Sequence, residues 1–153
     1  MLKYLTKTPS QTKKIGALLA KKILKTKPSK LAFLLGLEGD LGGGKTTFLQ
    51  GFAKGLRVKQ RILSPTFVIM RKFQIPTKTY NLKPKTFIHI DCYRIKNPKE
   101  LLDLGFKEII SNPQNIVAVE WADHIRKIMP ENTTWAVFEF INKNKRKISI
   151  KSK

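Results

Sequence analysis

The chain has 153 residues, with 31 Lys and Arg against 10 Asp and Glu, and its formal net charge is +21. This length suits one core of ordinary size, so we expect residues 1–153 to form a single domain. A single cysteine, Cys92, excludes an internal disulfide framework and a zinc site built from cysteines. No apolar stretch reaches the ~18 to 20 residues that cross a bilayer, and the N-terminus has no apolar signal core. We therefore predict a cytoplasmic protein without a membrane partner.

The first predicted helix begins at Ser10 as its cap and carries four apolar side chains at helical spacing: Ile15, Leu18, Leu19 and Ile23. A turn at Pro28-Ser29 separates it from residues 31–35, an apolar run that is typical of a buried strand.

Residues 39–46, Gly-Asp-Leu-Gly-Gly-Gly-Lys-Thr, match a Walker A phosphate loop. The glycines let backbone N–H groups turn toward phosphate oxygens. Lys45, with its stem exposed, places a positive charge against the outer phosphates, and the Thr46 hydroxyl can bind Mg²⁺. Residues 47–54 predict a helix whose positive end faces the anion, with Gly55 as its far cap. A glycine-rich turn is the plain alternative, but the surrounding strand and helix favour the phosphate loop.

The second half of the chain alternates strand and helix signals. Residues 62–70 and 86–93 read as extended segments, and Asn97-Pro98-Lys99-Glu100 predicts a capped helix start. Residues 116–119 are typical of a central strand, and residues 135–141 and 147–150 predict a closing hairpin. The alternation indicates a three-layer α/β fold of the P-loop NTPase type, with a mostly parallel central sheet flanked by helices.

Two acidic residues end predicted strands and are candidates for the chemistry that a phosphate loop alone cannot supply. Glu120 follows the apolar run 116–119, and Asp91 ends another strand in which His89 and Tyr93 share its face. The alternative is a pair of solvated carboxylates at strand ends. For His89, a packed or hydrogen-bonded strand histidine is a better account than a catalytic base.

The segment Ser64-Pro65-Thr66-Phe67 is a rigid turn with two hydroxyls just after the loop helix. Nucleotide switches often keep a phosphate-sensing threonine at such a place. An ordinary turn explains the pattern equally well.

Four motifs in this order resemble the TsaE (YjeE) family of small bacterial ATPases, which support threonylcarbamoyladenosine formation on tRNA. They are Gly-Asp-Leu-Gly-Gly-Gly-Lys-Thr-Thr-Phe at 39–48, Ser-Pro-Thr-Phe at 64–67, His-Ile-Asp-Cys-Tyr-Arg at 89–94 and Val-Glu-Trp-Ala-Asp at 119–123. The resemblance covers roughly residues 10–130. Nucleotide kinases share the loop but not the other three motifs in this sequence.

The resemblance implies a P-loop ATPase that binds ATP with Mg²⁺ and acts on the complex of the TsaB and TsaD proteins. ATP hydrolysis would reset that complex, and the protein would not transfer the carbamoyl group itself. This role would also bring the protein, directly or through its partners, close to tRNA.

The resemblance also implies roles for individual residues. The phosphates would be held by Asp40, Leu41, Gly42, Gly43, Gly44, Lys45, Thr46 and Thr47. Thr46 and Glu120 would bind the metal, Asp91 would support the metal water or the attacking water, and Thr66 would be the switch residue. Trp121 would pack by the nucleotide, although a buried aromatic is an equally fair account of it. Thr12, Asp123 and Arg146 are further candidates at the edges that close over the base and phosphates.

Two other classes of function remain open at this point. A small-molecule kinase would use the same loop, but it usually brings arginines on a mobile lid, and no Arg-rich insertion is present. The net charge suggests a basic RNA-binding or assembly module. However, only residues 143–147 form a dense basic run, and no RNA-binding motif accompanies them, so a solvated lysine-rich surface explains the charge at least as well.

Overall fold

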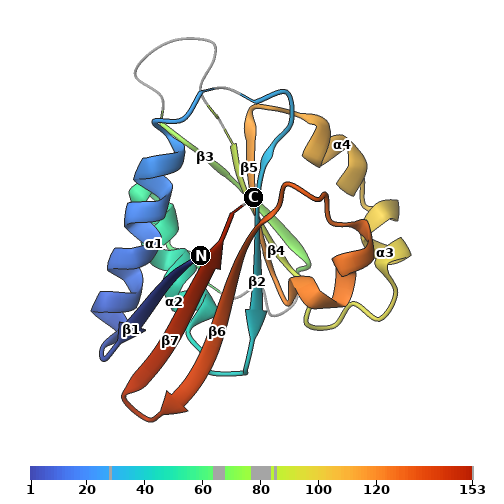
Figure 1. Cartoon of the computed structure of the whole chain (residues 1–153). Coiled ribbons are helices and arrows are strands. Elements are labelled where there is room, and N and C mark those ends of the chain that lie inside the picture. Colours follow the sequence, from blue (N-terminus) through green and yellow to red (C-terminus); the bar gives the residue numbers. More distant parts are fainter. Residues whose placement is uncertain (28, 64–67, 77–83, 85, 153) are drawn as a thin grey trace.

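In the computed structural model, which describes residues 1–27, 29–63, 68–76, 84 and 86–152, a mixed sheet forms the centre of the molecule (Figure 1). Its strands run across the sheet in the order β1-β7-β6-β2-β5-β4-β3. Their bounds are Leu2–Thr6 (β1), Phe33–Gly39 (β2), Met70–Gln74 (β3), Thr86–Asp91 (β4), Asn115–Glu120 (β5), Thr134–Asn142 (β6) and Lys145–Lys151 (β7).

The parallel part of the sheet is confined to its centre. Strand β2 pairs in parallel with β5 and β6, and β4 pairs in parallel with β5. The pairs β1/β7, β6/β7 and β3/β4 are antiparallel. The prediction of an α/β sheet is confirmed, but the prediction of a mostly parallel one is wrong. The β6–β7 hairpin, the N-terminal strand β1 and the edge strand β3 add antiparallel pairs at both edges, whereas helical crossovers build the centre.

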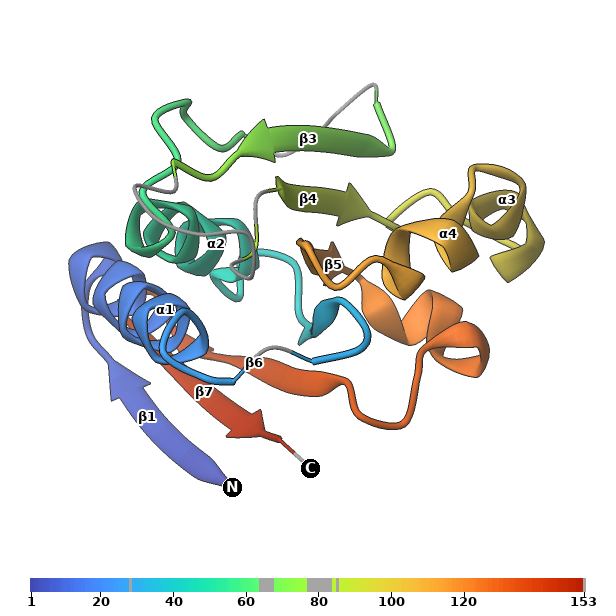
Figure 2. The same ribbon diagram turned by 90° about the horizontal axis from the view of Figure 1, so that it is seen from above.

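Helices cover both faces of the sheet, as Figure 2 shows from above. Helices α1 (Pro9–Ile23) and α2 (Lys45–Gly55) lie on one face, and their core includes Phe48, Phe52 and Phe138. The other face carries α3 (Pro98–Asp103), α4 (Phe106–Ser111) and the 3₁₀ helix η1 (Ala122–Ile128), which pack on a second core. This agrees with the predicted three-layer arrangement.

The helix starts depend on their capping chemistry. The prediction for α3 is confirmed, since Asn97 and Glu100 form a reciprocal capping box ahead of Pro98. The prediction for α1 is wrong by two residues. Thr8, not Ser10, accepts a hydrogen bond from the Gln11 N–H, and Pro9 occupies the first helical position. Helix α2 ends at Gly55, and its C-cap is Leu56.

The strands differ from prediction mainly at their limits. Strand β2 begins at Phe33 and continues to Gly39, so the apolar run 31–35 marks only its first half. The extended segment predicted over 62–70 becomes a strand only from Met70, and residues 64–67 lie outside the described residues. The predicted strand at 116–119 is confirmed within β5, and the predicted hairpin is confirmed as β6 and β7. None of the described helices is long and apolar enough to cross a membrane.

Candidate functional site

The Walker A residues connect the end of β2 to the first turn of α2, beside the central parallel strands. Gly42 and Gly44 adopt left-handed backbone conformations with φ of 72° and 100°, which favour glycine. Gly44 is the N-cap of α2, and the helix begins at Lys45. The loop therefore joins a buried strand to a helix N-terminus, where unpaired N–H groups and the helix dipole favour an anion.

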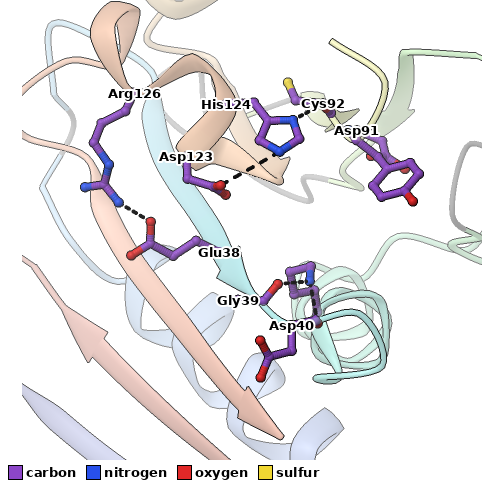
Figure 3. A network of polar contacts seen from close by, with 10 residues as sticks. Glu38, Gly39, Asp40, Asp91, Cys92, Asp123, His124 and Arg126 are labelled. Atoms are coloured by element: carbon purple, nitrogen blue, oxygen red, sulfur yellow. Dashed lines mark hydrogen bonds and ion pairs between the residues drawn. The ribbon is translucent and has the colours of Figure 1, made fainter. Parts of the chain in front are cut away.

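Lys45 lies inside this loop. Its side chain is folded back, so the ammonium Nζ donates to the carbonyl oxygens of Gly39 at 2.6 Å and Asp40 at 2.8 Å (Figure 3). The same ammonium lies 3.8 Å from the centroid of the Trp121 ring, a cation–π contact. The residue is only 5% exposed, so the expectation of an exposed stem is wrong.

The pKa of the Lys45 ammonium is lowered, because the effect of burial outweighs that of the nearby acids. Burial lowers the pKa of its ammonium, and the carboxylates of Glu120, Asp123, Asp40 and Asp91 act in the opposite direction. These four acids come from three parts of the chain: the phosphate loop, the end of β4, and the segment from the end of β5 into η1. Lys45 is therefore a buried cation with four carboxylates close enough to affect its pKa.

Glu120 and Thr46 form the polar centre of the site. The Thr46 hydroxyl lies 3.1 Å from Oε1 and 3.0 Å from Oε2 of the Glu120 carboxylate. On its other side, Oε1 lies 2.9 Å from Nε2 of His89. Glu120 is 3% exposed and His89 is fully buried, so both side chains are fixed by hydrogen bonds and by packing. The structure thus brings together the two residues expected to hold the metal.

Asp91 ends the neighbouring strand in register with Glu120. Its Oδ1 accepts a hydrogen bond of 2.9 Å from the Tyr93 N–H, which fixes the turn that follows β4. Because parallel strands end at the same edge of a sheet, both carboxylates belong to the edge from which the phosphate loop also leaves.

Trp121 directly follows Glu120 and turns the chain into η1 with a left-handed backbone, φ 57°. Its ring contacts those of Tyr93 and His124, at centroid distances of 5.1 and 5.8 Å. Asp123 is the next acidic residue in the sequence, and its carboxylate lies 3.9 Å from Nε2 of His124. The other ring nitrogen of His124, Nδ1, lies 2.8 Å from the Cys92 carbonyl oxygen. Figure 3 shows Asp123 and His124 above the loop, on the side of η1.

The β6–β7 hairpin is joined to the phosphate loop by two hydrogen bonds. The Phe140 N–H donates to Asp40 Oδ2 at 3.3 Å, and Arg146 Nε donates to the Gly42 carbonyl at 2.9 Å. A hollow of about 150 Å³ opens here, lined by Lys7, Thr12, Gly42, Thr47, Lys143 and Arg146 among others. Thr12 is buried and bonds the Thr6 hydroxyl at 2.9 Å. The structure therefore brings Thr12, Thr47 and Arg146 together beside the loop.

Of the remaining predicted site residues, Leu41 and Gly43 are described by the structure and Thr66 is not. Leu41 is 78% exposed at the tip of the loop. Its side chain is not packed in the core, so its part in phosphate binding would come from its backbone. Gly43 donates its N–H to the Asp40 carbonyl at 3.0 Å and so closes the loop's turn. Thr66 lies outside the described residues.

Sequence reasoning missed three contributions to this corner. The strand β1 and the residues Lys7 and Thr8 that follow it line the hollow, although the N-terminal residues carry no motif. The ion pair between Glu38 and Arg126 ties η1 to β2 just before the loop (Figure 3). The bond of His89 to Glu120 gives a buried histidine a partner in the site; the shared strand face of His89 and Asp91 was the only signal for it.

Comparisons with known proteins agree with one another. The family model for the threonylcarbamoyl adenosine biosynthesis protein TsaE matches residues 6–148. The tRNA threonylcarbamoyladenosine biosynthesis protein TsaE of Bacillus subtilis is 37% identical over 149 residues, which are 97% of this chain and 84% of that protein. The protein of the same name from Rickettsia felis is 33% identical over 141 residues, covering 92% and 74% of the two chains.

A solved structure gives the same result for the fold. The crystal structure of Bacillus subtilis YdiB superposes with a TM-score of 0.73 at 32% identity, covering 99% of this chain and 84% of that one. The sequence match, the shared fold and the phosphate loop at its centre lead to one assignment: the chain belongs to the TsaE family, whose members are named for tRNA threonylcarbamoyladenosine biosynthesis.

Proposed function

We propose that this protein is a Mg²⁺-dependent ATPase that assists threonylcarbamoyladenosine modification of tRNA. One observation carries the proposal. The Walker lysine, the Thr46–Glu120 pair and Asp91 meet at the N-terminus of α2, where a triphosphate would find donors on one side and acids on the other.

Phosphate binding would use the main chain of residues 40–47 and the Lys45 ammonium. The ammonium now donates to two carbonyl oxygens of its own loop. Anionic phosphate oxygens are stronger acceptors for an ammonium than neutral carbonyls, because they add the attraction between opposite charges. Lys45 would therefore exchange its carbonyl partners for the outer phosphates, and the Trp121 ring would limit where its charge can go.

The residues around Thr46 fit a magnesium ion. Mg²⁺ prefers oxygen ligands and is usually held by one or two carboxylates together with substrate phosphates. The Thr46 hydroxyl and the Glu120 carboxylate supply such oxygens 3.0 Å apart. Among the described residues, no group of three or more His, Cys, Asp or Glu side chains is placed to hold a metal ion, so the phosphates would have to supply the remaining ligands. Bound there, the ion would neutralise charge that develops on the transferred phosphoryl group.

Hydrolysis also needs a water molecule in line with the terminal phosphate. Asp91, at the strand end next to Glu120, would orient that water or a water on the metal. We assign Thr66 the role of a switch that senses the terminal phosphate. Trp121 and Asp123 would border the nucleotide from the side of η1.

The hollow between the loop and the hairpin would receive the base and ribose. Its lining joins Thr12 at the start of α1 to Arg146 on β7, with Thr47 between them. Thr12 and Thr47 offer hydroxyls to the sugar and phosphates, and Arg146 offers a planar cation for stacking or for a phosphate oxygen.

We further propose that the ATPase acts on the TsaB–TsaD complex, close to tRNA in the cytoplasm. Support comes from the relatives named for the same tRNA modification. ATP hydrolysis would reset the complex between cycles and would leave the carbamoyl transfer to the partners.

The test compares Mg·ATP hydrolysis by the protein alone and with TsaB and TsaD from the same source, with the Lys45→Ala protein as the matched control. We expect slow hydrolysis alone, stimulation by the pair, and neither with Lys45→Ala. Phosphorylation of an added metabolite would instead indicate a small-molecule kinase. Salt-sensitive RNA binding that is indifferent to Mg·ATP would indicate an RNA-binding module.

A further inference from the structure

His89 is a buried polar side chain whose hydrogen bonding is incomplete. It is fully buried in β4, and one ring nitrogen, Nε2, lies 2.9 Å from Glu120 Oε1. The other nitrogen, Nδ1, is the one buried side-chain nitrogen or oxygen without a partner in the part of the chain that the structure describes. Buried polar groups are nearly always paired, so such an exception asks for an explanation.

The core side of His89 is apolar, and the residue paired with it on β3 is the exposed Arg71. Phe87, His89 and Asp91 share one face of β4, because strand side chains alternate. Phe87 belongs to the core beneath α2, and the residue opposite His89 on β5 is Ala118 of the same core. His89 is therefore the last layer of that core before the carboxylates at the edge of the sheet.

The hydrogen bond identifies which ring nitrogen carries the proton. An ionised carboxylate only accepts hydrogen bonds, so Nε2 must be the donor to Glu120. Nδ1 has no acceptor nearby, and a second N–H there would be a buried donor without a partner. A neutral ring with its hydrogen on Nε2 satisfies both conditions.

The two carboxylate oxygens of Glu120 differ in their contacts. Oε1 lies 2.9 Å from His89 Nε2 and 3.1 Å from Thr46 Oγ1, whereas Oε2 lies 3.0 Å from Thr46 Oγ1 and makes no contact with His89. A carboxylate held by one oxygen cannot rotate freely about its last bond. We infer that His89 is a positioning residue, which holds Oε1 of Glu120 from inside the sheet so that Oε2 faces Thr46 and the magnesium ion that this pair would bind. The inference rests on the proposed function.

Two substitutions of matched size separate positioning from simple packing. His89→Gln keeps an N–H donor at about the place of Nε2, and His89→Met has similar length without a donor. Residues that orient metal ligands typically change metal affinity by about 10–100-fold when removed. Mg²⁺ would be titrated calorimetrically into each protein holding a non-hydrolysable ATP analogue, and binding of the analogue without Mg²⁺ would be measured separately.

We expect His89→Met to weaken Mg²⁺ binding at least ~10-fold, with analogue binding in the absence of Mg²⁺ changed less than about twofold. His89→Gln should lie closer to the wild-type Mg²⁺ affinity than to that of His89→Met. Wild-type Mg²⁺ affinity in His89→Met, or equal losses in the two variants, would overturn the positioning role and leave the ATPase proposal standing. Absence of Mg²⁺ and analogue binding in the wild-type protein would overturn both.

A second measurement does not depend on the variants folding. Nitrogen-15 NMR of the wild-type imidazole distinguishes the two neutral tautomers by the shifts of the two ring nitrogens. We expect the hydrogen on Nε2, with and without nucleotide. A hydrogen on Nδ1 would overturn the inference, because the bond to Glu120 would then lack its donor.

Discussion

The contact between α1 and α2 supports the phosphate loop from behind, and Gly51 is its closest point. A Cβ atom added at Gly51 would lie 1.9 Å from the carbonyl oxygen of Lys13 on α1. An ordinary carbon–oxygen contact is about 3.3 Å, so Gly51→Ala would force the helices apart by more than roughly 1 Å. The obstacle is helix backbone, which cannot rotate away as a side chain would.

Two effects of this substitution oppose each other. Alanine is favoured over glycine in a helix by about 1 kcal/mol. Overpacking typically costs about 1–3 kcal/mol and occasionally more, and a separation of this size against backbone belongs at the upper end. We therefore expect Gly51→Ala to lower the free energy of unfolding by about 2 kcal/mol. Since α2 begins at Lys45 and α1 begins at the hollow, nucleotide affinity should fall as well.

The assay is equilibrium unfolding in urea followed by circular dichroism. The control is Lys54→Ala, an exposed position on the same helix, where we expect a change within about 0.5 kcal/mol. A Gly51→Ala protein as stable as the wild type, or more stable, would refute the reasoning. It would mean that helix propensity outweighs the close approach, and that α1 moves away at little cost.

Three further predictions concern single side chains. Lys45→Ala should abolish ATP binding in calorimetry, because the Lys45 ammonium is held inside the loop against the carbonyl oxygens of Gly39 and Asp40; retained turnover by a folded variant would contradict the assignment. Glu120→Gln should reduce ATP hydrolysis by at least ~100-fold while nucleotide affinity measured without Mg²⁺ changes little; hydrolysis at the normal rate would exclude Glu120 as the metal acid. Burial, with smaller effects from Asp91 and Asp123, raises the pKa of the Cys92 thiol from 9.0 to about 12. Its contribution to stability should be full below pH 9.0 and lost as the pH rises toward about 12. Unfolding measured across that range should show the wild type losing stability relative to Cys92→Ala, and parallel curves would be the contrary result.

Local chemistry explains why much of the fold is predictable from the sequence. The capping box at Asn97 and Glu100 needs only four consecutive residues, and β5 is a continuous apolar run that ends at its acid. The phosphate loop is likewise local, since its conformation depends on its own glycines. Each of these signals lies within a short window, and the structure agrees with each.

Features that depend on distant partners were not predictable in this way. Strand β1 becomes a strand only because β7 offers it an edge to pair with, far away in sequence. Ser10 and Thr8 are both good caps in isolation, and Pro9 decides between them, since proline suits the first turn. The expectation of an exposed Lys45 stem failed for a similar reason, because Trp121, the N-cap of η1, packs against the end of the Lys45 side chain.

In the candidate site, too, the residues within motifs were predictable, whereas contacts between distant strands were not. Motif positions gave Thr46, Glu120 and Asp91, and the structure brings Thr46 and Glu120 into contact and sets Asp91 beside Glu120 in register. Strand periodicity places His89 on the same face as Asp91, but it does not identify Glu120 as the partner of His89, since that bond depends on the register of β4 against β5. The edges of the hollow beside the phosphate loop, from Lys7 to Arg146, likewise depend on which strands become neighbours.

The fastening of the β6–β7 hairpin to the phosphate loop has a consequence for biosynthesis. The loop leaves the ribosome early, but Phe140 and Arg146, which bond to Asp40 and Gly42, are translated about a hundred residues later. Strand β1 must also wait for β7 before it can pair. A nascent chain that stops short of residue 134 would carry the Walker sequence without the hairpin wall of its hollow, so the complete hollow should form only after β6 and β7 have been synthesised.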